Sequence, residues 1–154
     1  MNMVLGIFKQ DLPKEYQKDI VRNISPFIRD EDLYLAQLSI DLLVSIINVY
    51  AVSSDEYDEA IRNAISLSKS SLVQGAVIDR LTDLFGVVGS NNLADTNAIV
   101  SQLMTNINKN SLVPTARCIS AVIQHGGAST YIKKFTGNVL FLFIWNVNVI
   151  LSAY

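Results

Sequence analysis

The stretch LAQLSIDLL at residues 35–43 decides the fold, because its spacing of apolar residues returns twice further along the chain. In each copy a Val or Leu is followed, three and eight positions later, by a small or apolar residue. The other copies are VQGAVIDRL at 73–81 and VPTARCISA at 113–121. Their starts are 38 and 40 residues apart, inside the range of periods that paired-helix repeats show. The chain is therefore expected to consist of repeated pairs of helices.

Apolar residues at helical spacing outline the individual helices of these pairs. Seven helices are predicted, at about residues 13–27, 30–50, 53–68, 70–89, 95–107, 111–127 and 129–135. A unit of two helices cannot cover its own apolar face, so neighbouring units stack into a superhelix. We predict an all-α solenoid of three HEAT-like helix pairs plus an incomplete fourth pair, which the seventh helix begins.

Local signals indicate the ends and the inner faces of several helices. Asp30 is expected to cap the second helix by accepting hydrogen bonds from its first amides, and Asp95 is expected to start the fifth. Gly89 is expected to end the fourth helix, since glycine readily adopts the left-handed conformation that closes a last turn. In the second helix, the residues expected to face inward are Leu35, Leu38, Leu42, Leu43 and Ile46.

The end of the chain differs from the rest, which divides it into a HEAT-repeat segment at 1–134 and an apolar tail at 135–154. No charged residue follows Lys134, and the tail is about long enough to cross a bilayer. Its three asparagines fit poorly in lipid, and its β-branched and aromatic residues favour a strand. Three interpretations stay open: an aberrant tail in place of the missing helix, a buried helix or strand, and a membrane anchor.

The composition disfavours nucleic acid and membrane surfaces as partners. The net charge is −2, the isoelectric point is near 5.2, and no long run of Lys or Arg is present. Charged residues make up 17% of the chain, against about 25% in typical soluble domains, and the mean hydropathy is +0.31. We therefore expect a segment of a longer protein, whose uncovered solenoid ends lead to self-association.

Few residues are suited to catalysis or metal binding. Cys118 and His125 are seven positions apart on one predicted helix, so roughly 10 Å separates their backbones, too far for a nucleophile and its base. One Cys and one His also cannot supply the four ligands of a structural zinc site. We predict no catalytic residue, no metal and no cofactor, and hence no enzyme. The single cysteine and the lack of a signal-peptide pattern favour a reducing, intracellular setting, and we predict a location in the cytoplasm and nucleus.

Three aspartates are the candidate partner-binding residues. Asp79 and Asp83 are one helical turn apart with Arg80 beside them, and Asp41 belongs to the preceding second helix. Because the second helix of each pair lines one wall of a HEAT solenoid, we expect these three carboxylates to meet a basic partner. The alternative is a solvated face, since exposed like charges on a helix usually have no further role.

Three segments resemble a known family. They are SSLVQGA at 70–76, GSNNL at 89–93 and ARCISA at 116–121. In order, they are similar to a Ser-Pro-Leu-Leu-Gln-Gly-Gly-Ala segment, a Gly-Thr-Asn-Asn-Leu turn and an Ala-Lys-Cys-Val-Ala-Ala helix. On these segments, residues 20–128 resemble the middle of the cullin-associated, neddylation-dissociated proteins, which are long HEAT-repeat solenoids. Ser71 stands where the family has Pro, and the tail has no counterpart.

The resemblance implies a non-enzymatic scaffold in the assembly of cullin–RING ubiquitin ligases. Family members bind cullins that lack the ubiquitin-like modifier, together with the RING subunit, and help to exchange substrate-receptor modules. That exchange needs both ends of a long clasp, so a chain that matches only the middle repeats is expected to be unable to exchange receptors alone. An unrelated HEAT-repeat scaffold and a small tail-anchored membrane protein are the alternatives.

Overall fold

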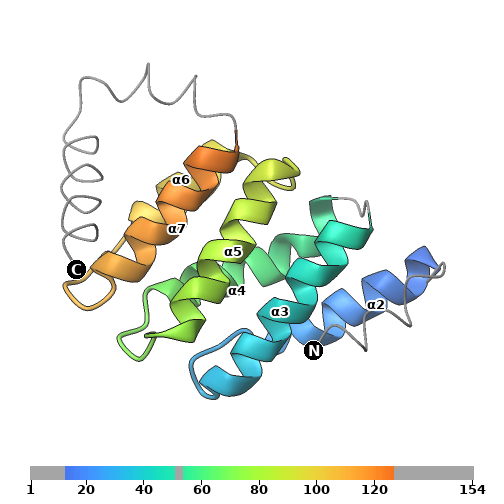
Figure 1. Cartoon of the computed structure of the whole chain (residues 1–154), viewed down its shortest axis with the longest axis horizontal. Helices are drawn as coiled ribbons and strands as arrows, with labels where there is room; N and C mark the ends of the chain where they lie inside the picture. The colour runs from blue at the N-terminus through green and yellow to red at the C-terminus, as the bar shows by residue number, and fades with distance from the viewer. Residues whose placement is uncertain (1–12, 51–53, 127–154) are drawn as a thin grey trace.

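The computed structural model describes residues 13–50 and 54–126, and these residues form an all-α fold without β-strands (Figure 1). The all-α prediction is therefore confirmed. The α-helices are α2 (Lys14–Ile24), α3 (Leu33–Val49), α4 (Asp58–Ser68), α5 (Ala76–Ser90), α6 (Thr96–Met104) and α7 (Leu112–His125). Two short 3-10 helices, η1 (Ser25–Phe27) and η2 (Ser54–Tyr57), follow α2 and precede α4.

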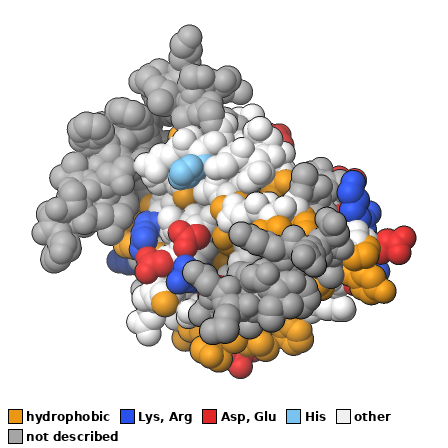
Figure 2. Space-filling view, turned by 45° about the vertical axis from the view of Figure 1, so that its right-hand side comes forward, with side chains coloured by type: hydrophobic (Ala, Val, Ile, Leu, Met, Phe, Trp, Pro, Cys, Tyr) orange, Lys and Arg blue, Asp and Glu red, His pale blue; other side chains and the backbone are white. Residues whose placement is uncertain are grey.

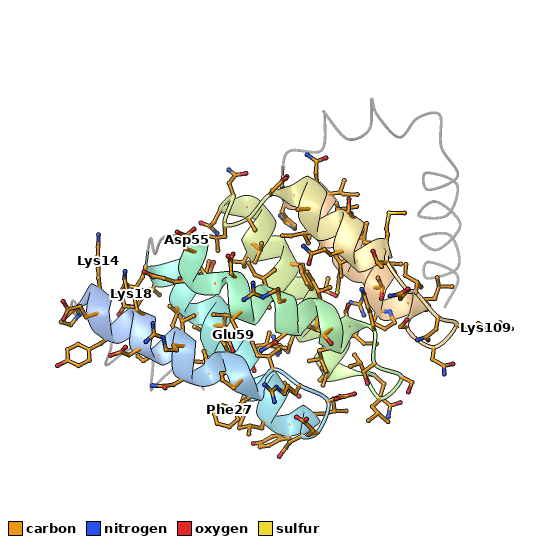
Figure 3. The ribbon with its side chains drawn as sticks, turned by 180° about the vertical axis from the view of Figure 1, so that it is seen from behind. Lys14, Lys18, Phe27, Asp55, Glu59 and Lys109 are labelled. Atoms are coloured by element: carbon orange, nitrogen blue, oxygen red, sulfur yellow. The ribbon has the colours of Figure 1, made fainter. Side chains whose placement is uncertain are left out.

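The six described helices lie in two layers. In one layer α3, α5 and α7 lie side by side and run in the same direction, with α5 in the middle (Figure 1). Seen from behind, α2, α4 and α6 follow one another in the other layer (Figure 3). Each helix of this second layer is followed in the chain by a helix of the first layer. Consecutive helices therefore form pairs, α2 with α3, α4 with α5 and α6 with α7.

The hydrophobic core lies between the two layers. Its largest fully buried side chains include Tyr57 at the start of α4, Ile40 and Leu43 of α3, and Phe85 of α5. Burying one such apolar side chain contributes about 1.5–3 kcal/mol. Contact between the layers is thus the main source of stability, and it requires each helix to present one apolar side.

The start of the second helix differs from the prediction, because Asp32 and not Asp30 is its cap. Asp32 has an extended backbone, and its carboxylate accepts a hydrogen bond from the Leu35 amide at 2.9 Å. Asp30 instead accepts a hydrogen bond from the Ser70 hydroxyl at 2.8 Å, which links the turns before α3 and α5. Asp95 caps α6 as predicted, accepting from an amide of the first turn.

The end and the beginning of α5 also differ from the prediction. The helix begins only at Ala76, after Gly75, whose φ of +56° lies in the left-handed region that glycine adopts without strain. At the other end Gly89 is still helical, and the left-handed residue is Asn92. Gly89 has a different role, which is to allow the backbones of α5 and α7 to approach closely.

Several residues of the predicted apolar stripes are exposed. In α3, Leu35 and Leu42 are each 37% exposed, whereas Ala36, Ile40 and Ile47 are buried. The prediction that those two leucines face inward is therefore wrong, because α3 is apolar over more of its circumference than the core covers. Apolar residues at helical spacing are also exposed in other helices, namely Tyr16, Phe27, Ala76, Ala98, Met104 and Val113.

Some predictions fall outside the described residues. These are the helix at 129–135, the fourth pair that it would begin, the tail at 135–154 and the boundary after residue 134. The arrangement of the described helices as repeats of a HEAT-like solenoid stays a prediction and is taken up below.

Candidate functional site

A groove crosses the layer formed by α3, α5 and α7, and we call it the second-helix groove. It encloses about 520 Å³ and is lined by residues that include Val44, Asn48, Asp83, Arg117, Ser120 and Gln124. The space-filling view shows acidic and basic side chains gathered together beside uncharged polar surface (Figure 2). The groove therefore combines a hollow shape with hydrogen-bonding groups and both signs of charge, as protein-binding surfaces commonly do.

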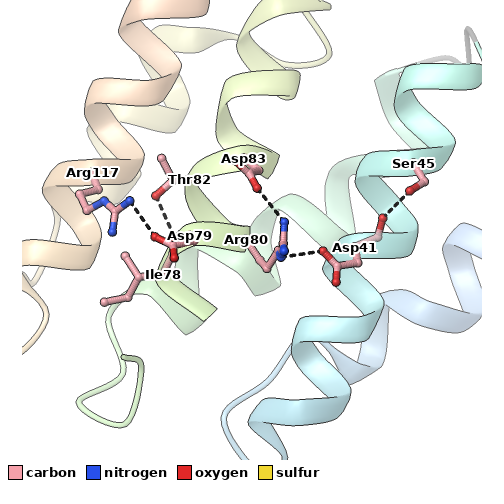
Figure 4. Close-up of polar contacts among 8 residues, drawn as sticks. All are labelled: Asp41, Ser45, Ile78, Asp79, Arg80, Thr82, Asp83 and Arg117. Atoms are coloured by element: carbon pink, nitrogen blue, oxygen red, sulfur yellow. Dashed lines mark hydrogen bonds and ion pairs between the residues drawn. The ribbon is translucent and has the colours of Figure 1, made fainter. Parts of the chain in front are cut away.

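An ion-pair ladder runs across the edge of this groove (Figure 4). Arg80 of α5 reaches Asp41 of α3, with Nε 2.9 Å from Oδ1, in an ion pair whose N–H does not form an aligned hydrogen bond. The same guanidinium donates through Nη1 to Asp83 Oδ2 at 3.1 Å. Arg80 thus neutralises two of the three predicted aspartates and connects α3 with α5.

The third predicted aspartate is paired in the same manner with the next helix. Asp79 of α5 forms an ion pair with Arg117 of α7, with Oδ1 2.8 Å from Nη2 (Figure 4). Asp41 and Asp79 are 38 residues apart, and each pairs with an arginine of the following helix in its layer. The ladder therefore repeats with nearly the period of the sequence.

The structure brings the three predicted aspartates to one face, but with compensating charges. Arg80 and Arg117 balance them, so this face is not an open acidic surface. The side chains of Asp79 and Asp83 remain 60% and 53% exposed, whereas that of Asp41 is only 15% exposed. Sequence reasoning named Arg80 beside two of the aspartates but missed Arg117 and the pairings between helices, although the two arginines are 37 residues apart, close to the repeat period.

Three hydroxyl groups near the groove donate their hydrogen bonds to the main chain of their own helices. Ser45, Thr82 and Ser90 each donate to the carbonyl oxygen four residues earlier, at 2.8, 2.7 and 2.9 Å. Thr82 and Ser90 line the groove. Their oxygens keep free lone pairs, so this part of the groove offers acceptors to a partner that supplies N–H or O–H donors.

The environment of Cys118 bears on the predicted absence of nucleophilic and metal chemistry. Cys118 is fully buried, and burial, partly offset by Arg117, raises the pKa of its thiol to about 12. A thiol in that state is a poor nucleophile. No group of three His, Cys, Asp or Glu residues that could hold a metal occurs in the described ranges.

The opposite layer carries a second polar hollow, of about 540 Å³, between α2, η2 and α4. Lys18 of α2 forms an ion pair with Glu56 of η2, and the Glu56 side chain is only 14% exposed. Figure 3 shows Lys14 and Lys18 along α2, with Asp55 and Glu59 on the neighbouring segment. The two signs of charge are mixed here, so this hollow does not single out one class of partner.

Comparison with known proteins assigns no family to the chain. No helix within residues 13–50 and 54–126 is long and apolar enough to cross a membrane. The resemblance to the cullin-associated proteins stays a prediction, because no model of a protein family matches the chain and no solved structure matches it.

Proposed function

We propose that this chain is a non-enzymatic protein-binding scaffold built from HEAT-like helix pairs that stack as a solenoid. The observation that carries the proposal is the repeated pairing of Asp41 with Arg80 and of Asp79 with Arg117. The same contact between successive helices of one layer is what translational stacking of equivalent units produces. Such stacks offer extended surfaces, and their usual role is to bind other proteins.

The second-helix groove is the proposed binding face. Its charges are internally balanced, so we expect recognition by shape and hydrogen bonds more than by net attraction. Asp79 and Asp83 are exposed enough to contact a Lys or Arg of the partner while they keep their own arginines. Asp41 is mostly covered and is proposed to orient Arg80.

The proposed partner is a cullin with its RING subunit, in the regulation of cullin–RING ligases. The support for this choice is the order and spacing of SSLVQGA, GSNNL and ARCISA at 70–76, 89–93 and 116–121. GSNNL forms the end of α5 and its following turn, and ARCISA lies within α7. ARCISA therefore lies inside a helix of the proposed binding layer, and GSNNL lies at the end of one.

A pull-down with purified cullin–RING complexes tests this function. The immobilised chain is expected to retain the complex without the ubiquitin-like modifier and to release the modified complex. A double variant, Asp79→Ala with Asp83→Ala, is expected to retain less, while Asp19→Ala on exposed surface of α2 serves as the control. Equal retention of both complexes would favour an unrelated HEAT-repeat scaffold, and no retention of either would refute the cullin assignment.

A further inference from the structure

One flank of α3 is an exposed apolar stripe. Leu35, Leu42 and Val49 recur every seven residues and are 37%, 37% and 52% exposed. We call these three residues the α3 stripe. The only charged residue of α3, Asp41, pairs with α5, so the stripe contains no charge. Exposed helix sides are normally polar, so this side has the composition of a covered surface.

Comparison of α3 with α5, one repeat later, indicates which kind of helix the stripe would contact. Adding 38 residues to Leu42 and Val49 gives Arg80 and Val87 of α5. Those two residues face α3, since Arg80 pairs with Asp41 and Val87 packs on the core and lines the groove. The α3 stripe therefore occupies the positions through which α5 contacts α3. By this equivalence, α3 would use the stripe to contact a helix that precedes it in the same layer.

The residues that precede α2 have the pattern of such a helix. Residues 1–12 read MNMVLGIFKQDL and lie outside the described residues. If they are plotted as a helix, Val4, Leu5, Phe8 and Leu12 fall within about a third of its circumference. Twelve helical residues extend about 18 Å, against about 21 Å from Leu35 to Val49.

The attachment point allows residues 1–12 to reach the stripe. Lys18 of α2 pairs with Glu56 of η2, seven residues after the end of α3, so the beginning of α2 lies at the Val49 end of α3. Pro13 has an extended backbone at this point, with φ −53° and ψ 143°. A segment that ends at Leu12 is therefore attached near Val49, from where it can reach along the stripe toward Leu35.

We propose that residues 1–12 bind along the α3 stripe of the same chain and take the position of a preceding second helix. Covalent attachment gives this segment a high effective concentration at the stripe, which favours it over a second copy of the chain. The inference does not depend on which protein the second-helix groove binds. It implies that self-association through α3 occurs only when this segment is displaced.

Disulfide trapping in the full chain tests the proposal. The background variant is Cys118→Ala, which removes the only thiol. Leu5→Cys is combined with Leu42→Cys, and a second pair joins Leu12→Cys with Val49→Cys. The matched control joins Leu5→Cys with Leu72→Cys, because Leu72 is 56% exposed in the turn before α5.

The proposal predicts a bond within one chain for both test pairs and none for the control pair, on non-reducing gels after mild oxidation. A bond between two chains would instead identify a second copy as the occupant and overturn the proposal. Equal bonding of the test and control pairs, or no bonding of either test pair, would also overturn it. Circular dichroism of each variant identifies any that does not fold, and the other test pair then decides.

A polar substitution gives an independent readout. Phe8→Asp is expected to lower the midpoint of thermal unfolding and to produce concentration-dependent association, because it uncovers the α3 stripe. Gln10→Asp, on the opposite side of the same helical plot, is the control and is expected to change neither. Equal behaviour of the two variants would contradict the proposal.

Discussion

Gly89 of α5 lies so close to Val122 of α7 that a Cβ atom on Gly89 would be 2.9 Å from the Val122 carbonyl oxygen. The same Cβ would be 3.1 Å from the amide nitrogen of Gly126. Both neighbours are backbone atoms of one helix end, so neither can rotate away. A residue larger than glycine would therefore collide with α7 at this position.

Gly89→Ala is therefore expected to destabilise the protein by about 1–3 kcal/mol, the usual cost of overpacking. Gly86→Ala is the matched control one turn away in α5. Its Cβ would meet only the His125 side chain, at 3.3 Å, which can move. Because alanine favours helices by about 1 kcal/mol over glycine, the control is expected to be neutral or stabilising. Urea unfolding distinguishes the two, and similar midpoints would contradict the close contact.

The ion-pair ladder is expected to contribute modestly to stability. A double-mutant cycle of Asp41→Ala and Arg80→Ala is predicted to give a coupling energy of about 0.5–1 kcal/mol, since Asp41 is largely covered. The more exposed pair, Asp79 with Arg117, is predicted to give less. Both couplings should weaken in 1 M salt. A larger coupling for the exposed pair would show that exposure does not control the strength of the ladder.

Asp32, which caps α3, and the nearby Asp30 are expected to contribute differently to stability. Asp32→Ala removes the hydrogen bond to the Leu35 amide and is expected to cost about 1 kcal/mol of unfolding free energy. Asp30→Ala breaks only an exposed hydrogen bond to Ser70 and is expected to cost less. Thermal unfolding of the two variants measures the difference, and the reverse order would restore Asp30 as the cap.

Tyr57 carries a hydroxyl with an unusual environment. The ring is fully buried, and its oxygen has no hydrogen-bond partner among the described residues. Tyr57→Phe is therefore expected to raise the unfolding free energy at neutral pH by about 1 kcal/mol, because an unsatisfied buried polar group is removed. Tyr34→Phe, at a site 70% exposed, should change nothing. A loss of stability in the first variant would indicate a hydrogen bond that the hydroxyl makes.

The same tyrosine predicts how stability depends on alkaline pH. Burial, with a smaller effect of Glu56, raises the pKa of Tyr57 from 10.0 to about 12, and burial raises that of Cys118 from 9.0 to about 12. A raised pKa means that the folded state holds its proton more tightly, so this stability is complete below the unfolded values and is lost as pH rises toward 12. Urea midpoints should fall from about pH 9 upward, and less steeply in Tyr57→Phe; parallel curves would contradict the assignment.

Much of the fold follows from local pattern. Asp95 predicts the start of α6 correctly, and helical spacing of apolar residues predicts α4, because capping and spacing act within a few residues. The side that α3 buries is less predictable. Its sequence is apolar nearly all round, so spacing alone did not reveal that Leu35 and Leu42 are exposed.

The pairing of charges in the candidate site could not be predicted, because it depends on contacts between residues far apart in the sequence. The sequence brought Asp41, Asp79 and Asp83 to attention as an acidic set, but charge compensation depends on how neighbouring helices align. Arg80 lies beside Asp79 in the chain and yet pairs with Asp41 and Asp83, while Asp79 pairs with Arg117. Such choices are set by the relative rotation of α3, α5 and α7, which one sequence does not specify.

The affinity of the chain for an unmodified cullin–RING complex, measured by biolayer interferometry, tests the central claim that the second-helix groove binds a protein. Ser120→Trp fills the groove, and Ser101→Trp adds the same bulk to exposed surface of α6 in the opposite layer. We predict that Ser120→Trp weakens binding at least about tenfold, which corresponds to about 1.4 kcal/mol, and that Ser101→Trp leaves it unchanged. Absence of binding by the unsubstituted chain, or equal effects of the two substitutions, would contradict the account.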